Sequence, residues 1–173
     1  MRTTTTRSLL CIGLLLASTS ARAADGEPDP MTVGDSLPEF SLKDQFGVER
    51  FVDDSVLLIL FSRNMEGGEL LKTGLESLPE GALSAAHFVY VSDISGMPRL
   101  VARMFALPKM RKRPYPMLLD RTGEWTALLP GTPGRATFIH LDRLMIREIE
   151  ELTSAEAVQR RIDALLAAPK PAR

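Results

Sequence analysis

Two glutamates three residues apart, Glu66 and Glu69, enclose a pair of glycines in the segment FSRNMEGGELLK, residues 61–72. Apolar residues open the segment and leucines at helical spacing follow, so it is predicted to turn from a strand into a helix. Gly67 and Gly68 allow backbone amides to approach a ligand closely, and a helix N-terminus favours an anion there. The two glutamates already bring negative charge to that helix end, so their alternative role is stabilisation of the first turn.

A metal ion is the second chemistry that these carboxylates suggest. Glu66, Glu69 and Asp93 could converge at the carboxyl edge of a sheet, and carboxylates suit hard cations. The three acids lack a dedicated binding loop, and His87 and His140 lie on separate predicted strands with no partner at ligand spacing. The sequence also lacks the glycine patterns of phosphate-binding and dinucleotide-binding loops. We therefore predict no metal site and no cofactor.

A basic segment and a set of methionines accompany the second predicted helix. The basic residues, next to Tyr115, are Lys109, Arg111, Lys112 and Arg113. They could hold an anionic lipid or a partner, although such a short cluster after a helix C-terminus is also typical of a solvated helix end. The methionines at positions 97, 104, 110 and 117 are irregularly spaced, which favours core packing over a copper site.

The first 23 residues are typical of a cleavable export signal. Arg2 and Arg7 precede the short apolar run LLCIGLLLA, residues 9–17, and Ala21-Arg22-Ala23 has the small-x-small pattern of a cleavage site. This run is well short of the roughly 20 residues that a membrane span needs. We therefore expect cleavage after Ala23, export to the periplasm or the medium, and no stable membrane insertion.

Cleavage would remove Cys11, the one cysteine of the chain. The mature protein would then have no thiol for disulfides, nucleophilic catalysis or metal binding. It would carry 18 Lys and Arg against 22 Asp and Glu, a net charge of −4. Such a mildly acidic protein is not expected to bind nucleic acid.

The elements that must position these residues follow from hydrophobic periodicity and turn signals. Predicted strands are a hairpin at 40–52 around Gly47, a buried central strand at 56–61, and strands at 87–93, 117–120, 124–129, 136–141 and 144–152. Predicted helices are 68–78, 98–107 with a cap at Ser95 or Gly96, and a C-terminal helix that begins with a capping box of Thr153 and Glu156. This order indicates an α/β fold with a mixed central sheet and helices on both faces. A flexible lead-in at 24–34, one domain at 35–168 and a tail at 169–173 follow from the composition.

Two segments resemble the peroxiredoxin and thiol-disulfide reductase families, which share a thioredoxin-like fold. The segment VGDSLPEFSLKDQFG matches the start of those families at Gly34, Pro38, Phe40, Leu42 and Asp44. The segment RPYPMLLDRTGEWTALLPGTPGRATFIHLDRLMIREIE matches their later half at Pro116, Leu118, Asp120, Gly123, Arg135, Thr137, Phe138 and Ile139. The resemblance covers residues 33–165 and implies a thioredoxin-like three-layer sandwich.

The chain departs from these families at the residues that perform their chemistry. Thiol-disulfide reductases place Cys-x-x-Cys, and peroxiredoxins their peroxidatic cysteine, at the corner occupied here by Glu66-Gly67-Gly68-Glu69. Because that chemistry needs a thiolate, the chain resembles a member that has lost its redox function. The candidate binding corner comprises Arg63, Glu66, Gly67, Gly68, Glu69, Pro116 and Arg135. In peroxiredoxins the arginine at the position of Arg135 lies beside the cysteine, so we expect Arg135 either to pair with Glu66 or Glu69 or to point into solvent beyond the loop 130–134.

Three functions are compatible with these observations. The first is an exported, non-catalytic binding or assembly module whose partner is an unidentified protein or small molecule. The second is a thiol-independent enzyme, possibly metal-assisted, at the Glu66–Glu69 corner, with no thiol peroxidase or disulfide reductase activity. The third is a redox protein that uses Cys11 and retains its signal. No catalytic residue is predicted.

Overall fold

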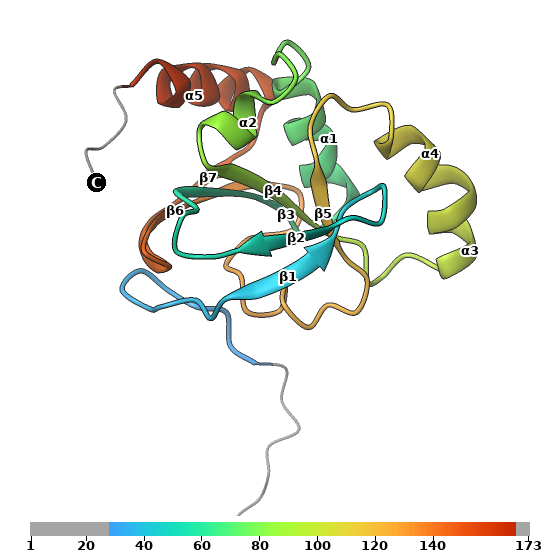
Figure 1. Cartoon of the computed structure of the whole chain (residues 1–173), viewed down its shortest axis with the longest axis horizontal. Helices are drawn as coiled ribbons and strands as arrows, with labels where there is room; N and C mark the ends of the chain where they lie inside the picture. The colour runs from blue at the N-terminus through green and yellow to red at the C-terminus, as the bar shows by residue number, and fades with distance from the viewer. Residues whose placement is uncertain (1–27, 169–173) are drawn as a thin grey trace, which may run out of the picture.

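A five-stranded mixed sheet forms the centre of the molecule, which we describe from a computed structural model for residues 28–168 (Figure 1). Its strands, in spatial order, are β5 (Met117–Asp120), β4 (Phe88–Asp93), β3 (Leu58–Ser62), β6 (Ala136–Asp142) and β7 (Met145–Leu152). Strands β3, β4 and β5 are parallel, and β6 is antiparallel to both β3 and β7. The predicted export signal, residues 1–23, and the tail, 169–173, lie outside the described residues.

Strand β3 lies in the middle of this sheet and is buried along its whole length, which confirms the central strand predicted from its continuous apolar run. Its side chains alternate between the two faces, as strand geometry requires. Leu58 and Leu60 join one hydrophobic core, while Ile59 and Phe61 join the other.

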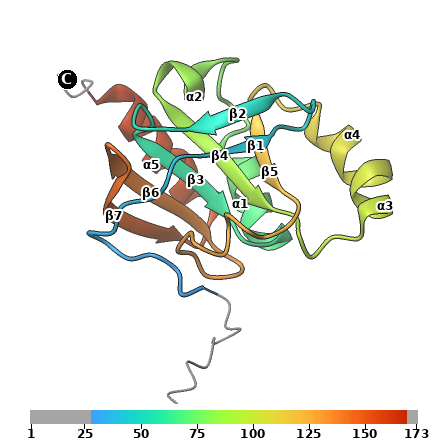
Figure 2. The ribbon, with the colours of Figure 1, turned by 60° about the horizontal axis from the view of Figure 1, so that its bottom comes forward.

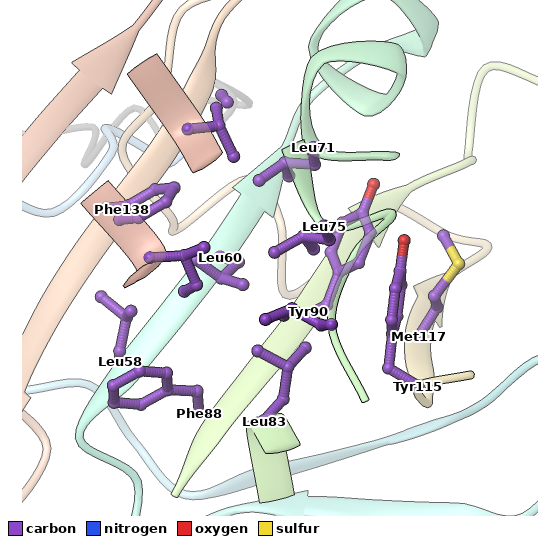
Figure 3. Close-up of a cluster of buried hydrophobic side chains, with 14 of the residues drawn as sticks. Leu58, Leu60, Leu71, Leu75, Leu83, Phe88, Tyr90, Tyr115, Met117 and Phe138 are labelled. Atoms are coloured by element: carbon purple, nitrogen blue, oxygen red, sulfur yellow. The ribbon is translucent and has the colours of Figure 1, made fainter. Parts of the chain in front are cut away.

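The first core lies between the sheet and three helices (Figures 1 and 3). These helices are α1 (Met65–Gly74), α2 (Ala82–Ala85) and α5 (Ala155–Ala167). Leu71 of the first and Leu75 at its C-cap, together with Val158 and Ile162 of the last, are completely buried there. Burial of each such side chain stabilises the fold by roughly 1.5–3 kcal/mol.

The second core is covered by a hairpin and a loop rather than by helices. The hairpin consists of β1 (Phe40–Lys43) and β2 (Glu49–Val52), and Phe40 stacks on Trp125 with ring centroids 5.0 Å apart. The predicted mixed α/β fold is therefore confirmed, whereas the expectation of helices on both faces does not describe how this core is covered. Figure 2 shows the hairpin and the C-terminal helix on opposite sides of the sheet.

The helical segment that connects β4 to β5 contains a widened turn. It runs through α3 (Arg99–Val101), the π-helical turn η1 (Ala102–Ala106) and α4 (Leu107–Met110). The Leu107 amide donates to the Ala102 carbonyl, one residue further back than in an α-helix. Pro108 has no amide hydrogen and its ring would clash with the carbonyl four residues earlier, which explains why the turn widens here.

Several predicted boundaries differ from the structure. Residues 124–129 form turns instead of a strand, and α1 begins at Met65 instead of residue 68. The N-cap of α5 is Ser154, whose hydroxyl accepts from the Ala157 amide, so the predicted Thr153 capping box is wrong. The helix after β4 has Pro98 as its N-cap with no side-chain cap, not Ser95 or Gly96.

The segment from Gly34 to Asp44, which includes β1, contacts both outer strands of the sheet. Gly34 and Leu37 donate backbone hydrogen bonds to Ile146 and Leu144 at the β7 edge, and Asp44, after β1, forms an isolated bridge with Leu118 of β5. None of the helices within residues 28–168 combines the length and apolar composition required to cross a membrane.

Candidate binding site at the start of helix α1

Asn64 connects the start of α1 to the loop before β6. It has an extended backbone and caps the helix, because its Oδ1 accepts from the Gly67 amide at 3.1 Å. The same oxygen accepts from the Gly134 amide at 3.0 Å. One side chain therefore satisfies two backbone donors and fixes the predicted corner against the loop that carries Arg135.

Gly67 is required where it stands because α1 packs against the backbone of that loop. A Cβ at this position would lie 2.2 Å from the Arg135 carbonyl oxygen. The Arg135 backbone is thus beside the corner, as the resemblance implied. Gly68 has more room, since a Cβ there would be 3.7 Å from both the Ser62 and Tyr90 hydroxyl oxygens.

The Arg135 side chain does not form the ion pair that the sequence suggested. Its guanidinium lies 3.0 Å from Glu151 of β7, and Glu69 pairs with Lys72 one turn further along α1. No ion pair joins Arg135 to Glu66 or Glu69 within the part of the chain that the structure describes. The predicted pairing was wrong because β7 supplies a nearer carboxylate.

Arg63 is occupied by structural contacts. Its guanidinium donates to the carbonyl oxygens of Gly131 at 2.9 Å, Leu129 at 2.6 Å and Thr126 at 3.2 Å, and lies over the Phe61 ring. It therefore holds the 126–131 loop over the second core.

A cleft with a volume of about 310 Å³ lies beside this corner, between α1 and the α3–α4 segment. We call it the α1 cleft. Its apolar lining includes Met65, Met97, Val101, Phe105, Met110 and Met117. Gly68 and Glu69 of the predicted corner line it, and Pro116 lies between two lining residues, Tyr115 and Met117.

Three hydroxyl groups are buried together beneath the cleft. The Ser62 hydroxyl lies 3.3 Å from that of Tyr90 and donates to that of Ser92 at 3.1 Å. Burial raises the pKa of the Tyr90 phenol well above its ordinary value, despite its contact with Ser62. Tyr90 therefore stays protonated at any physiological pH and can act as a hydrogen-bond donor.

Tyr115 lies beside Tyr90, with ring centroids 6.1 Å apart, and Figure 3 shows the two phenols pointing the same way. Burial also raises the pKa of Tyr115, and the Arg113 charge partly opposes this rise. Arg113 has the same effect on the pKa of Tyr90. Arg113, Tyr90 and Tyr115 all line the cleft.

The basic segment divides between the cleft and other surfaces. Lys109 and Arg113 line the cleft, whereas Arg111 donates to the Gln45 carbonyl at 2.9 Å and Lys112 is exposed outside the lining. The sequence indicated this basic segment but not the hydroxyl groups, because Ser62 lies on β3 whereas Tyr90 and Ser92 lie on β4. The sequence indicates them only through polar residues, Ser62 and Ser92, near the ends of two strongly apolar strands.

A different cluster brings metal-binding groups together. Ligand atoms of His140, Glu148 and Glu150 lie within 4.8 Å of one another, on β6 and β7. The Glu150 carboxylate also accepts hydrogen bonds from Arg161 at both of its oxygens. His140 Nε2 lies 2.5 Å from the same carboxylate. Burial alone would raise the pKa of Glu150, but Arg161 and His140 hold it below its ordinary value. The histidine is thus satisfied by an ion-paired glutamate, as expected for a structural role.

Comparison with known proteins identifies the fold. No protein-family model matches the sequence, and no curated protein is similar to it. Similar solved structures include the peroxidoxin BcpB from Mycobacterium tuberculosis (19% identity, TM-score 0.53), which covers 79% of this chain and 96% of that one. A thiol:disulfide interchange protein DsbE from Chlorobium tepidum (17% identity, TM-score 0.51) covers 79% and 99% of the two chains, respectively. A peroxiredoxin-like protein from Aquifex aeolicus (12%, TM-score 0.51) covers 80% and 90%. The chain therefore has the thioredoxin-like fold of peroxiredoxins and thiol-disulfide oxidoreductases, and its described residues contain no cysteine.

Proposed function

We propose that this protein is an exported, non-catalytic binding module that holds a small molecule in the α1 cleft. The observation that carries the proposal is the cleft itself. A cavity of about 310 Å³ lies beside the corner where thiol enzymes of this fold have their cysteines, and residues 28–168 supply no thiol there.

The lining suits binding better than catalysis. Small-molecule sites are mostly apolar clefts with a few placed polar groups, and here methionine and phenylalanine side chains surround the hydroxyls of Tyr90 and Ser92. Methionine side chains are flexible and polarisable, so they adapt to ligands of different shape. Two of the carboxylates that a thiol-independent enzyme would use are otherwise engaged, since Glu69 pairs with Lys72 and Asp93 accepts from Ser95.

Export is the second part of the proposal and is supported by the N-terminal sequence alone. The basic start, short apolar run and Ala21-Arg22-Ala23 site have the organisation of a cleavable signal.

Methionine methyl groups provide a direct test of binding. Met65, Met97, Met110 and Met117 line the cleft, whereas Met31 and Met145 lie elsewhere and serve as internal controls. The mature chain would be labelled at its methionine methyls and titrated with a set of neutral, anionic and cationic apolar fragments. We expect at least one class to shift the four cleft signals and leave the two controls unchanged. If no class shifts the cleft signals, the proposed function is wrong.

A further inference from the structure

The mouth of the α1 cleft exposes large apolar side chains to water. Met65 is 73% exposed, Phe105 61% and Val101 43%. They come from both walls, α1 and the α3–α4 segment. Removal of such surface from water is favourable by roughly 25 cal/mol per Å². A ligand with an apolar portion would gain this energy.

The π-helical turn lies in one of these walls. Phe105 and Ala106 belong to η1 and both line the cleft. π-helical turns within α-helices frequently occur at functional sites. In this protein the widened turn carries Phe105, which is the most exposed aromatic side chain of the cleft.

Two cations in the lining have no acceptor among residues 28–168. Among residues 28–168, the side chains of Lys109 and Arg113 form neither a hydrogen bond nor an ion pair, although other basic groups nearby do. Lys72, the third base of the lining, is paired with Glu69. Lys109 and Arg113 are four residues apart at the end of the same helical segment, so both charges act on one end of the cleft.

The charge of the lining indicates the charge of the ligand. Three bases (Lys72, Lys109, Arg113) face two acids (Glu69, Asp93), an excess of one positive charge. A single negative charge would balance it, while a doubly charged phosphate would also face the two carboxylates. The planar Arg113 guanidinium matches a carboxylate in two-bond geometry.

We propose that the α1 cleft binds a free amphipathic monocarboxylate, with its aliphatic chain between α1 and the α3–α4 segment and its carboxylate at Lys109 and Arg113. This rests on the proposed function, since it assigns the ligand class of the same cleft. The volume of about 310 Å³ is at the lower end for small-molecule sites, roughly 300–1,000 Å³. It suits one medium-length chain rather than a two-chain lipid.

Three probes of equal chain length separate the contributions of charge and apolar surface. Octanoate, octanamide and octylamine would be titrated into the mature protein at low salt, with calorimetry for affinity and methionine methyl signals for location. Octanoate is expected to bind at least about tenfold more tightly than octanamide, which corresponds to about 1.4 kcal/mol. Octylamine is expected to bind most weakly, and added salt to reduce the advantage of octanoate.

Substitutions in the basic segment test where the carboxylate lies. Lys109→Gln with Arg113→Gln is expected to remove most of the preference for octanoate over octanamide. Lys112→Gln removes a charge from the same segment outside the cleft and is expected to leave the preference intact.

Several results would overturn the assignment. Equal binding of octanoate and octanamide in the cleft would contradict the carboxylate while leaving the proposed binding function standing. An equal loss in Lys112→Gln would show a general charge effect. Binding of anionic phospholipid vesicles that depends on Lys112 as much as on Arg113 would assign the basic segment to a lipid surface instead.

Discussion

Glu151 accepts two contacts, from the Arg135 guanidinium at 3.0 Å and from the Thr132 amide at 2.7 Å. The Arg135 side chain is 46% exposed, so solvent screens its ion pair. We expect Arg135→Ala to lower the free energy of unfolding by only about 0–1 kcal/mol. Urea unfolding at pH 7 measures this change, with Arg161→Ala as the comparison.

Arg161 contacts Glu150 through two bonds and is less exposed, and Glu150 also holds His140. We therefore expect Arg161→Ala to be more destabilising than Arg135→Ala. A loss above about 2 kcal/mol in Arg135→Ala would mean that this residue supports the corner through contacts stronger than a surface pair.

The position of Arg135 was predictable from its motif, but its partner was not. In the β6–β7 register Thr137 lies opposite Glu151, which brings this carboxylate to the start of β6. That register includes an irregularity between His140 and Leu141. Local sequence does not encode where such an irregularity occurs, so the nearer carboxylate could not be identified.

At the scale of elements, two adjacent glycines of α1 should respond oppositely to the same substitution. In Gly67→Ala the new methyl group would meet the Arg135 carbonyl, and we expect a loss of about 1–3 kcal/mol. In Gly68→Ala the methyl group has ordinary contacts, and reduced freedom of the unfolded chain should stabilise the protein by about 0.5–1 kcal/mol. Thermal and urea unfolding measure both, and destabilisation of equal size would refute the close approach at Gly67.

Asp120 organises the turn after β5. Its buried carboxylate accepts from the backbone amides of residues 122, 123, 125 and 126 and from the Thr126 hydroxyl. Burial alone would raise its pKa, but these hydrogen bonds outweigh burial and hold the pKa below its ordinary value. A lowered pKa in the folded state contributes stability above the unfolded pKa of about 3.9, and this stability is lost as pH falls through the folded value.

Asp120→Asn should therefore destabilise the protein by about 2–4 kcal/mol at pH 7, because the amide group presents a donor to buried donors. The variant should also lose less stability than the parent as pH falls below the unfolded pKa of about 3.9 toward the lower folded value, because only the parent has a carboxylate to protonate there. Urea unfolding across this pH range tests both. Asp54→Asn, an exposed site, is the control. An unchanged acid dependence in Asp120→Asn would contradict this role.

The same turn explains an element that the sequence did not predict correctly. Residues 124–129 have the composition of a strand, but the amides of Trp125 and Thr126 donate to Asp120 instead of to a neighbouring strand. Hydrophobic periodicity does not reveal a side chain that competes for backbone donors, even one only five or six residues away. The central strand β3 was predictable because its burial on both faces requires a continuous apolar run.

At the scale of the whole molecule, the proposed export signal predicts both the start and the chemistry of the mature protein. Intact-mass measurement of protein recovered from the exported fraction should show a chain beginning at Ala24. Such a chain should not react with thiol reagents and should have no thiol peroxidase or disulfide reductase activity. Activity abolished by a thiol reagent, in a chain that retains Cys11, would support the redox alternative.

The α1 cleft illustrates what a single sequence does not reveal. Its lining comes from α1, β4, the α3–α4 segment and the start of β5, residues spread from 64 to 117. The methionines that line it have irregular spacing in sequence, which had suggested simple core packing. Met65 and Met97 follow the carboxyl ends of the parallel strands β3 and β4, whereas Met110 and Met117 come from α4 and the start of β5.

The segment from Gly34 to Asp44 has a consequence for how the folded protein avoids self-association. It pairs with Leu144 and Ile146 at one outer strand and with Leu118 at the other. Unpaired outer strands are templates on which further chains can add. Because this segment occupies parts of both outer strands, it hinders the addition of strands from other molecules. Proteolytic loss of this segment would therefore uncover parts of both outer strands and favour aggregation.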